Sequence, residues 1–168
     1  MDFDGLIRRG LEVERRSAAD RPAPMLLDET LVVLHILAPE GGAFDGETLY
    51  AALAEAGFDR RRGELFVCAA EHGEYLALNA LKPGRFPAEP AGFATRAVGL
   101  VLPLAGSERP LAAFEDFLER ARGLSDALGG RLCDARRSSL TRQTIGYLRE
   151  EVQQYQLKHL AAQRKGGR

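Results

Sequence analysis

The chain has few of the residues that mark a secreted, redox or membrane protein. Its 168 residues include only two cysteines, Cys68 and Cys133, which are far apart and outside any CxxC spacing. Two such thiols are typical of reduced core side chains rather than of a disulfide framework or a zinc site. The longest apolar run, residues 31–37, is interrupted by His35 and is much shorter than the roughly 20 residues that a membrane-spanning helix needs. The first residues contain early acids and no apolar core of a signal peptide, so we expect no membrane segment in this chain.

The chain also lacks an excess of either charge. It has 23 Lys and Arg against 24 Asp and Glu, which gives a net charge of −1. A nearly neutral protein has no bulk electrostatic attraction for nucleic acid, so we expect no nucleic-acid partner. With 45% apolar and 28% charged residues, the composition is typical of one globular domain.

Residue patterns for catalysis or metal binding are missing as well. His35, His72 and His159 have no Ser or Cys at the spacing of a nucleophilic triad. The pair Gly41-Gly42 does not belong to a phosphate-binding loop. No group of residues has the spacing of metal ligands. We therefore predict a non-enzymatic protein without cofactor or metal.

Both ends of the chain differ from its middle. In residues 1–28 a few apolar side chains have the spacing of a short helical stripe, and Pro22 and Pro24 would break any longer helix. A helix this short is marginal alone, so we interpret residues 1–28 as a linker, with a docked or membrane-surface helix as the alternative. Residues 158–168 are basic and contain no acid, and we expect a frayed, solvated tail there. The domain itself is predicted to span residues 29–157.

Hydrophobic periodicity predicts an α+β domain. Strands are expected at residues 31–38, 65–70, 75–81 and 97–105, with two short strands in 131–140. Helices are expected from the N-cap Asp45 to residue 56, from Pro110 to residue 128, and from the N-cap Thr141 to residue 155. The run Arg60-Arg61-Arg62 is interpreted as a solvated loop. The order β-α-β-β-β-α-β-β-α fits a two-layer sandwich, with about six mostly antiparallel strands and three helices on one face.

The second face of this sheet is unusually apolar. Side chains alternate between the two faces of a strand, so a half-solvated sheet should be polar on its outer face. Alternation instead places an aliphatic set there: Leu31, Val33, Leu65, Val67, Leu76, Leu78, Ala80 and Val101. Such a surface marks a partner site, unless the N-terminal segment or a second copy of the chain covers it. We expect His35 on this face and partly exposed, and Asn79 on the other face, bonded to backbone groups of the neighbouring loop.

Three segments carry a family resemblance. They are FDGETLYAALAEAGF (residues 44–58), LALNALKPGRF (residues 76–86), and ALGGRLCDARRSSLTRQTIGYLREEV (residues 127–152). In this order and spacing they resemble the first helix, the N-x-x-KPG-x-F strand end and the GG-x-x-x-D-x-x-R hairpin of the C-terminal FtsZ-binding domain of the bacterial division protein ZipA. The resemblance extends over most of the chain.

The resemblance implies a cell-division adaptor that binds the C-terminal tail peptide of FtsZ, partly as a helix, on the open apolar face, and supports Z-ring assembly at the septum. It places the domain in the cytoplasm of proteins that are anchored in the inner membrane by an N-terminal helix, which this sequence lacks. Carried over by alignment, the peptide-binding positions are Leu31, Val33, Gly63, Leu65, Leu78, Ala80, Lys82, Gly99 and Val101. Lys82 would meet an acidic group of the peptide.

Several of these positions depart from the family. Gly63, Ala80, Gly99 and Val101 stand where relatives commonly have larger side chains, so the groove is expected to be deeper or matched to a different peptide. The alternative function is therefore a soluble paralogue that binds another peptide or self-associates through the same face. Arg60-Arg61-Arg62 would steer an acidic peptide toward the groove.

Two further classes of function remain as alternatives, namely RNA binding and a small-molecule or enzymatic domain. An RNA-binding sheet needs exposed aromatic side chains for base stacking. Here the pattern places the aromatics away from the open face: Phe66, Tyr75, Phe86, Phe93 and Phe114. A small-molecule or enzymatic domain needs a deep pocket with convergent polar groups, for which the sequence gives no sign.

Overall fold

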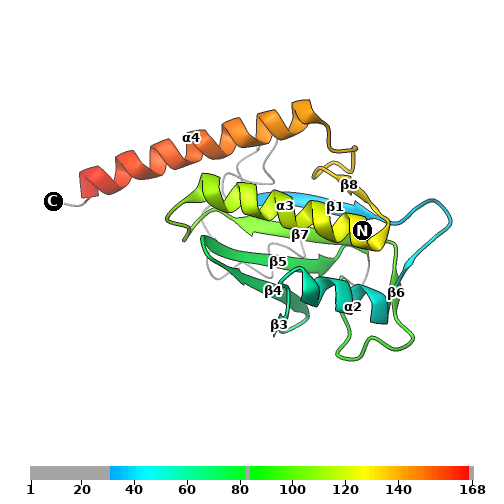
Figure 1. Cartoon of the computed structure of the whole chain (residues 1–168). Coiled ribbons are helices and arrows are strands. Elements are labelled where there is room, and N and C mark those ends of the chain that lie inside the picture. Colours follow the sequence, from blue (N-terminus) through cyan, green and yellow to red (C-terminus); the bar gives the residue numbers. More distant parts are fainter. Residues whose placement is uncertain (1–30, 82–83, 167–168) are drawn as a thin grey trace.

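A computed structural model describes residues 31–81 and 84–166 of the chain (Figure 1). Its main sheet has six strands in the order β3-β4-β5-β7-β1-β8, and every neighbouring pair is antiparallel. These strands are β1 (Leu31–Leu37), β3 (Arg60–Arg62), β4 (Leu65–Ala70), β5 (Gly73–Asn79), β7 (Ala97–Pro103) and β8 (Arg131–Cys133). A separate two-stranded sheet pairs β2 (Phe44–Asp45) with β6 (Ala94–Thr95).

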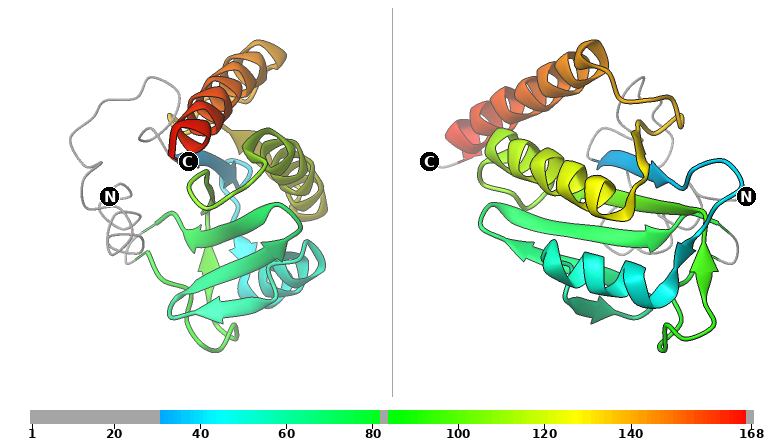
Figure 2. Two further views of the ribbon diagram at one scale, coloured as in Figure 1. Left: turned by 90° about the vertical axis from the view of Figure 1, so that its left-hand side faces the viewer. Right: turned by 45° about the vertical axis from the view of Figure 1, so that its right-hand side comes forward.

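The helices are α2 (Gly46–Glu55), α3 (Pro110–Leu128) and α4 (Arg142–Gly166). Figures 1 and 2 show α2 and α3 over one face of the sheet, with α4 beside α3. Within residues 31–81 and 84–166, this arrangement confirms the predicted α+β class, with a six-stranded antiparallel sheet and three helices. Among the described residues, no helix is long and apolar enough to cross a membrane.

The predicted starts of the three helices and the predicted end of α3 are confirmed. The Asp45 carboxylate accepts a hydrogen bond from the Thr48 backbone N–H (3.1 Å), and Thr141 Oγ1 accepts one from the Thr144 N–H (3.1 Å). Pro110 occupies the first turn of α3, where a missing N–H costs nothing. Gly129 ends α3 in the left-handed conformation (φ 65°) that glycine adopts without strain.

The sixth strand is not the one that the sequence predicts. Residues 60–62, expected to be a solvated loop, form the edge strand β3 and pair with residues 65–67 of β4. Their charged side chains are all exposed, a pattern that is typical of a loop. Their backbone nevertheless pairs with that of β4. Residues 131–140 contain only β8 and a single bridge between Cys133 and Ser139, where two strands were predicted.

The predicted frayed tail is also wrong over most of its length, because α4 continues to Gly166. Residues 147–165 contain neither glycine nor proline and are rich in Gln, Leu, Ala, Lys and Arg, all of which favour a helix. A lack of acids therefore changes the charge of this segment but does not end its helix.

The main core lies between the sheet and the helices. It contains the inward faces of β1, β5 and β7 and side chains of all three helices, including Leu53, Phe117 and Leu148. The aromatic side chains that the sequence places away from the open face all lie in or against this core. Both cysteines are buried and free, as predicted. Burial raises the pKa of the Cys68 and Cys133 thiols, so neither is an activated nucleophile.

A polar chain ties α3 to the sheet and to α2. The Tyr75 hydroxyl donates to Asp116 Oδ2 (2.7 Å), and Arg120 Nε donates to the same oxygen (2.8 Å). Arg120 Nη1 then reaches the Ala56 carbonyl at the end of α2 (2.9 Å). Burial alone would raise the pKa of Asp116, but the hydrogen bonds from Arg120 and Tyr75 outweigh it and hold that pKa below its ordinary value. Burial raises the pKa of Tyr75, with the Asp116 hydrogen bond adding to the effect.

Asn79 joins the end of β5 to the following loop, as predicted. Its side-chain oxygen accepts from the Thr95 hydroxyl (2.6 Å) and the Leu81 N–H (3.2 Å), and its amide donates to the Arg85 carbonyl (3.2 Å). The buried amide thus positions the segment that borders the candidate site.

Candidate functional site

An aliphatic row crosses four strands on the sheet face opposite the helices. Val67, Leu76, Val101 and Val33 are successive cross-strand neighbours on β4, β5, β7 and β1. Together with Leu31 and Leu78 they form one contiguous cluster, separate from the main core. We call these six residues the apolar cluster. Strand alternation predicts all six, whereas the family alignment omits Val67 and Leu76.

A second row lies next to the first and is uneven. Leu78, Gly99, His35 and Cys133 are cross-strand neighbours on β5, β7, β1 and β8. Gly99 contributes no side chain between Leu78 and His35. The surface is therefore lower at Gly99 than at Leu78, which suits an apolar side chain of a bound segment.

The apolar cluster is buried in the whole chain. Each of its side chains is at most 3% exposed, although an open face was expected. Among the described residues, all three helices contribute to the other core, and only Leu65 and Ala135 pack at the margin of the apolar cluster. The face is thus apolar as predicted, but it is not open to solvent.

The nine alignment-derived positions do not all meet at this cluster. Leu31, Val33, Leu78 and Val101 belong to it, and Leu65 packs against it. Ala80 and Gly99 are buried next to it. Gly63, by contrast, lies in the exposed turn between β3 and β4, and Lys82 is outside the described residues.

His35 is a buried side chain of the second row rather than a partly exposed one. It is 1% exposed, and its Nδ1 lies 3.0 Å from the Asp134 carbonyl oxygen. The Asp134 side chain accepts from the Arg136 and Ser138 N–H groups and so holds the turn that comes after β8. The prediction of exposure was wrong: His35 is buried, and its ring contacts this turn, which is distant in sequence.

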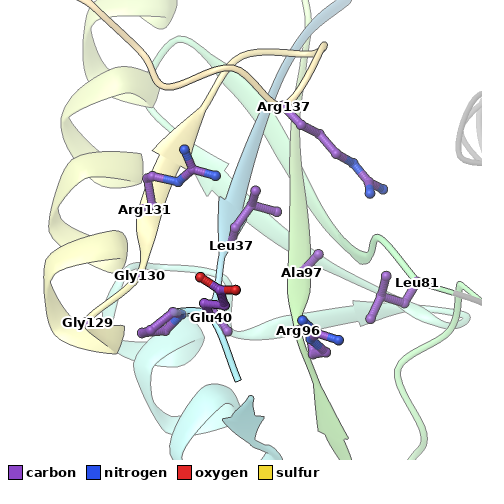
Figure 3. Close-up of a pocket in the computed structure, with 11 residues that line it drawn as sticks. Leu37, Glu40, Leu81, Arg96, Ala97, Gly129, Gly130, Arg131 and Arg137 are labelled. Carbon is purple, nitrogen blue, oxygen red and sulfur yellow. The ribbon is translucent and has the colours of Figure 1, made fainter. Parts of the chain in front are cut away.

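A basic pocket adjoins the apolar cluster at the end of the sheet where β1, β7 and β8 meet (Figure 3). It has a volume of about 900 Å³, and three arginines, Arg96, Arg131 and Arg137, line it together with Glu40. Its lining also includes Leu37, the last residue of β1, and Ala97, the first residue of β7. Leu37 follows the apolar-cluster residues of β1, and Ala97 precedes that of β7. A pocket with an excess of guanidinium groups suits a carboxylate.

Sequence reasoning missed these arginines as site residues. Arg131 and Arg137 lie within the hairpin segment of the family resemblance, residues 127–152, so the signal was present as a motif. The third arginine, Arg96, lies more than 30 residues before this segment and is brought close to it only by the pairing of β1 with β7 and β8.

Arg137 has an unusual backbone. It is the only described non-glycine residue with positive φ (66°), and its Nη2 donates to the Ala80 carbonyl at the end of β5 (3.4 Å). A left-handed conformation disfavours a residue with a Cβ. Arginine at this position therefore carries a cost in backbone energy, and such strained residues often lie at functional sites.

Two of the three arginines of β3 make contacts at the edge of the sheet. Arg62 binds Glu74 (2.8 Å), and Arg61 donates to the Phe86 carbonyl (2.7 Å) and lies over the Phe66 ring. Their contacts stabilise the sheet edge. Two arginines of the basic pocket also make hydrogen bonds, Arg131 to the Ser139 hydroxyl (2.9 Å) and Arg137 to the Ala80 carbonyl.

The described part of the chain shows no candidate metal centre beside this face. Residues 31–81 and 84–166 contain no group of three or more His, Cys, Asp or Glu side chains that could hold a metal ion. The described aromatic rings lie on the helix side of the sheet, so the apolar cluster offers no platform for base stacking.

Comparison with known proteins agrees with this architecture. The family described as "ZipA, C-terminal FtsZ-binding domain" matches residues 30–151. The cell division protein ZipA of Ectopseudomonas mendocina is 34% identical over 159 residues, which is 90% of this chain and 58% of that protein. The ZipA proteins of Pseudomonas putida (strain W619) and Azotobacter vinelandii are 33% and 34% identical, over 97% and 82% of this chain and 57% and 50% of theirs. The chain spans about half the length of the curated relatives that it matches.

Proposed function

Because the chain belongs to the family of the ZipA C-terminal FtsZ-binding domain, we propose that it is a non-enzymatic cell-division adaptor that binds the C-terminal peptide of FtsZ. The peptide lies on the apolar cluster, and its acidic group enters the basic pocket. Through this contact the domain supports Z-ring assembly on the cytoplasmic side of the septum.

The observation that supports this proposal best is the aliphatic row across β4, β5, β7 and β1. It joins four strands into one apolar surface on the face away from the helices, next to three arginines. An amphipathic peptide can place apolar side chains on such a surface and a carboxylate in the pocket. Since the contacts are mainly apolar with few polar anchors, we expect micromolar affinity.

A matched pair of isosteric substitutions tests the binding face. Val101 lies in the apolar cluster and Val152 in the main core, and both are fully buried. Val101→Thr places a hydroxyl under the bound peptide and should weaken binding roughly tenfold, or about 1.4 kcal/mol. Val152→Thr should leave affinity within about twofold, because it lies on the helix side of the sheet. Calorimetric titration with a synthetic FtsZ tail peptide measures both.

Two results would count against the proposal. A folded wild-type chain that binds no FtsZ tail peptide at any accessible concentration removes FtsZ as the partner. Equal losses of affinity for Val101→Thr and Val152→Thr remove the apolar cluster as the binding face. Circular dichroism and thermal unfolding of each variant confirm that the loss does not reflect unfolding.

A different peptide is the second candidate partner, favoured by the missing side chain of Gly99 and the small Ala80. A large apolar side chain of that peptide would fill the space at Gly99. Self-association through the same face is the other alternative, and sedimentation at two concentrations distinguishes it from a monomer.

A further inference from the structure

The second half of α4 extends past the helix that supports it. α3 and α4 run antiparallel, because Arg149 binds Glu115 while Gln156 Oε1 accepts a hydrogen bond from the Leu111 N–H (2.9 Å). Leu111 is the second residue of α3, so after Gln156 α4 no longer has α3 beside it. Figure 1 shows this end of α4 projecting from the domain. We call residues 157–166 the α4 extension; they rise about 15 Å along the helix axis.

The α4 extension carries exposed leucines. Among the described residues, the exposed large apolar side chains are all on α4, namely Tyr147 (49% exposed), Leu157 (54%) and Leu160 (40%). Leu157 and Leu160 are three residues apart, so they are neighbours on one side of the helix. Neither packs against an apolar core of the described residues, whereas Tyr155, just before the extension, still packs against the main core.

The charges of the α4 extension have one sign. Its sequence contains Lys158, Arg164 and Lys165 and no acid. Glu108 and Arg109, both exposed just before α3, contribute one charge of each sign at this end of the molecule. The α4 extension is therefore a basic region of a chain whose net charge is −1.

Exposed leucines beside basic residues suit an anionic membrane surface. On such a surface, leucines enter the boundary between headgroups and acyl chains, and Lys and Arg approach the lipid phosphates. A nucleic acid would use the charges but would leave both leucines in water. A second copy of the same segment would bring like charges together, and two leucines bury much less than the roughly 800 Å² per partner of a stable interface.

We propose that the α4 extension binds to the surface of a membrane that contains anionic phospholipid, with Leu157 and Leu160 entering the headgroup region. The helix lies on the membrane, since the extension is much shorter than the roughly 20 residues that a span needs. Near such a surface each basic residue raises the affinity by a factor of about five. The contact uses neither the apolar cluster nor the basic pocket, so it is independent of the proposed function.

Co-sedimentation of the full chain with lipid vesicles tests the proposal. We expect binding to vesicles of phosphatidylglycerol and phosphatidylcholine in equal amounts, and roughly tenfold weaker binding to vesicles of phosphatidylcholine alone. The double variant Leu157→Gln, Leu160→Gln should bind the anionic vesicles about tenfold more weakly than the wild type, because glutamine is not stabilised by entering the headgroup region. Tyr147→Gln, which changes the exposed apolar side chain outside the extension, is the matched control and should bind like the wild type.

A second pair of variants tests the contribution of charge. Lys158→Gln should weaken binding to the anionic vesicles about fivefold. Arg122→Gln removes the same charge from an exposed position on α3 and should leave binding unchanged. Glutamine favours a helix and all the replaced side chains are exposed, so each variant should fold, which circular dichroism checks.

The proposal is overturned if the wild-type chain does not bind the anionic vesicles. It is also overturned if the leucine double variant binds them as tightly as the wild type. In that case another segment makes the contact, or the extension is a purely electrostatic site for a polyanion such as nucleic acid.

Two further results decide between the proposal and its alternatives. A dimer that forms without lipid and that the leucine double variant dissociates, measured by sedimentation, shows that the leucines pair with a second copy, and overturns the proposal. Weaker vesicle binding of the leucine double variant and of Lys158→Gln, with both control variants unchanged, supports it. Equal losses in the control variants overturn it, because the effect is then not specific to the α4 extension.

Discussion

At the scale of single residues, Arg137 combines a backbone cost with a side chain aimed at the candidate site. Its φ of 66° favours glycine, yet arginine occupies the position and reaches the Ala80 carbonyl. Replacement by glycine removes both the strain and the guanidinium, whereas replacement by alanine removes only the guanidinium. The two variants therefore separate stability from binding.

We expect Arg137→Gly to be more stable than Arg137→Ala by about 1 kcal/mol, because only glycine adopts this backbone without strain. Both variants should lose the same affinity for an acidic peptide. Urea unfolding and peptide titration of the two proteins check this. If peptide affinity followed stability across the pair, Arg137 would have a structural role only.

Sequence reasoning succeeded for Asn79 and failed for His35, and the difference is one of distance along the chain. The partners of Asn79 include Leu81 and Arg85, within six residues, so its role follows from its place at a strand end. The ring of His35 is buried and contacts a turn about 100 residues away. Burial that depends on such a contact is not contained in the local pattern.

At the scale of elements, the polar chain through Asp116 and Arg120 is the link between α2, α3 and the sheet. Asp116 accepts from Tyr75 and Arg120, and Arg120 also binds the end of α2. The pKa of Asp116 is lower in the folded chain than its ordinary value. Its contribution to stability is therefore complete above the unfolded pKa, near 3.9, and is lost as the pH falls through the folded pKa.

We expect Asp116→Asn to lower the free energy of unfolding by about 1 kcal/mol at pH 7, since the carboxylate is partly exposed and screened. The variant and the wild type should converge as the pH falls below about 4. Urea unfolding at several pH values measures the difference, and Glu119→Gln on the exposed side of α3 is the control. A difference that stayed constant down to pH 2 would show that ionisation of Asp116 is not the cause.

The elements that were mispredicted from the sequence share one property. The pattern of their side chains does not indicate the secondary structure of their backbone. Residues 60–62 are three exposed arginines on an edge strand, and residues 158–166 are a basic stretch of helix. Periodicity detects a buried face, and neither segment presents a regular one. The six apolar-cluster residues, in contrast, are buried on alternate positions of four strands and were all predicted.

At the scale of the whole molecule, a net charge of −1 conceals an uneven distribution. The basic pocket gathers Arg96, Arg131 and Arg137 against Glu40 at one end of the apolar cluster. A local excess of positive charge would steer the proposed acidic peptide toward the site, although the molecule as a whole has no such attraction. Salt should therefore affect association with the peptide more than the net charge suggests.

We expect the association rate constant for an acidic FtsZ tail peptide to fall several-fold as ionic strength rises from about 0.02 to 0.5 M, because the Debye length shrinks below about 5 Å. Arg96→Gln should slow association at low salt and flatten this dependence, while dissociation changes less. Arg122→Gln on α3 removes the same charge away from the pocket and should leave the dependence unchanged. Stopped-flow measurements of the three proteins provide the comparison. Equal salt dependence for Arg96→Gln and Arg122→Gln would mean that the pocket does not steer the peptide, and that binding depends on the apolar cluster alone.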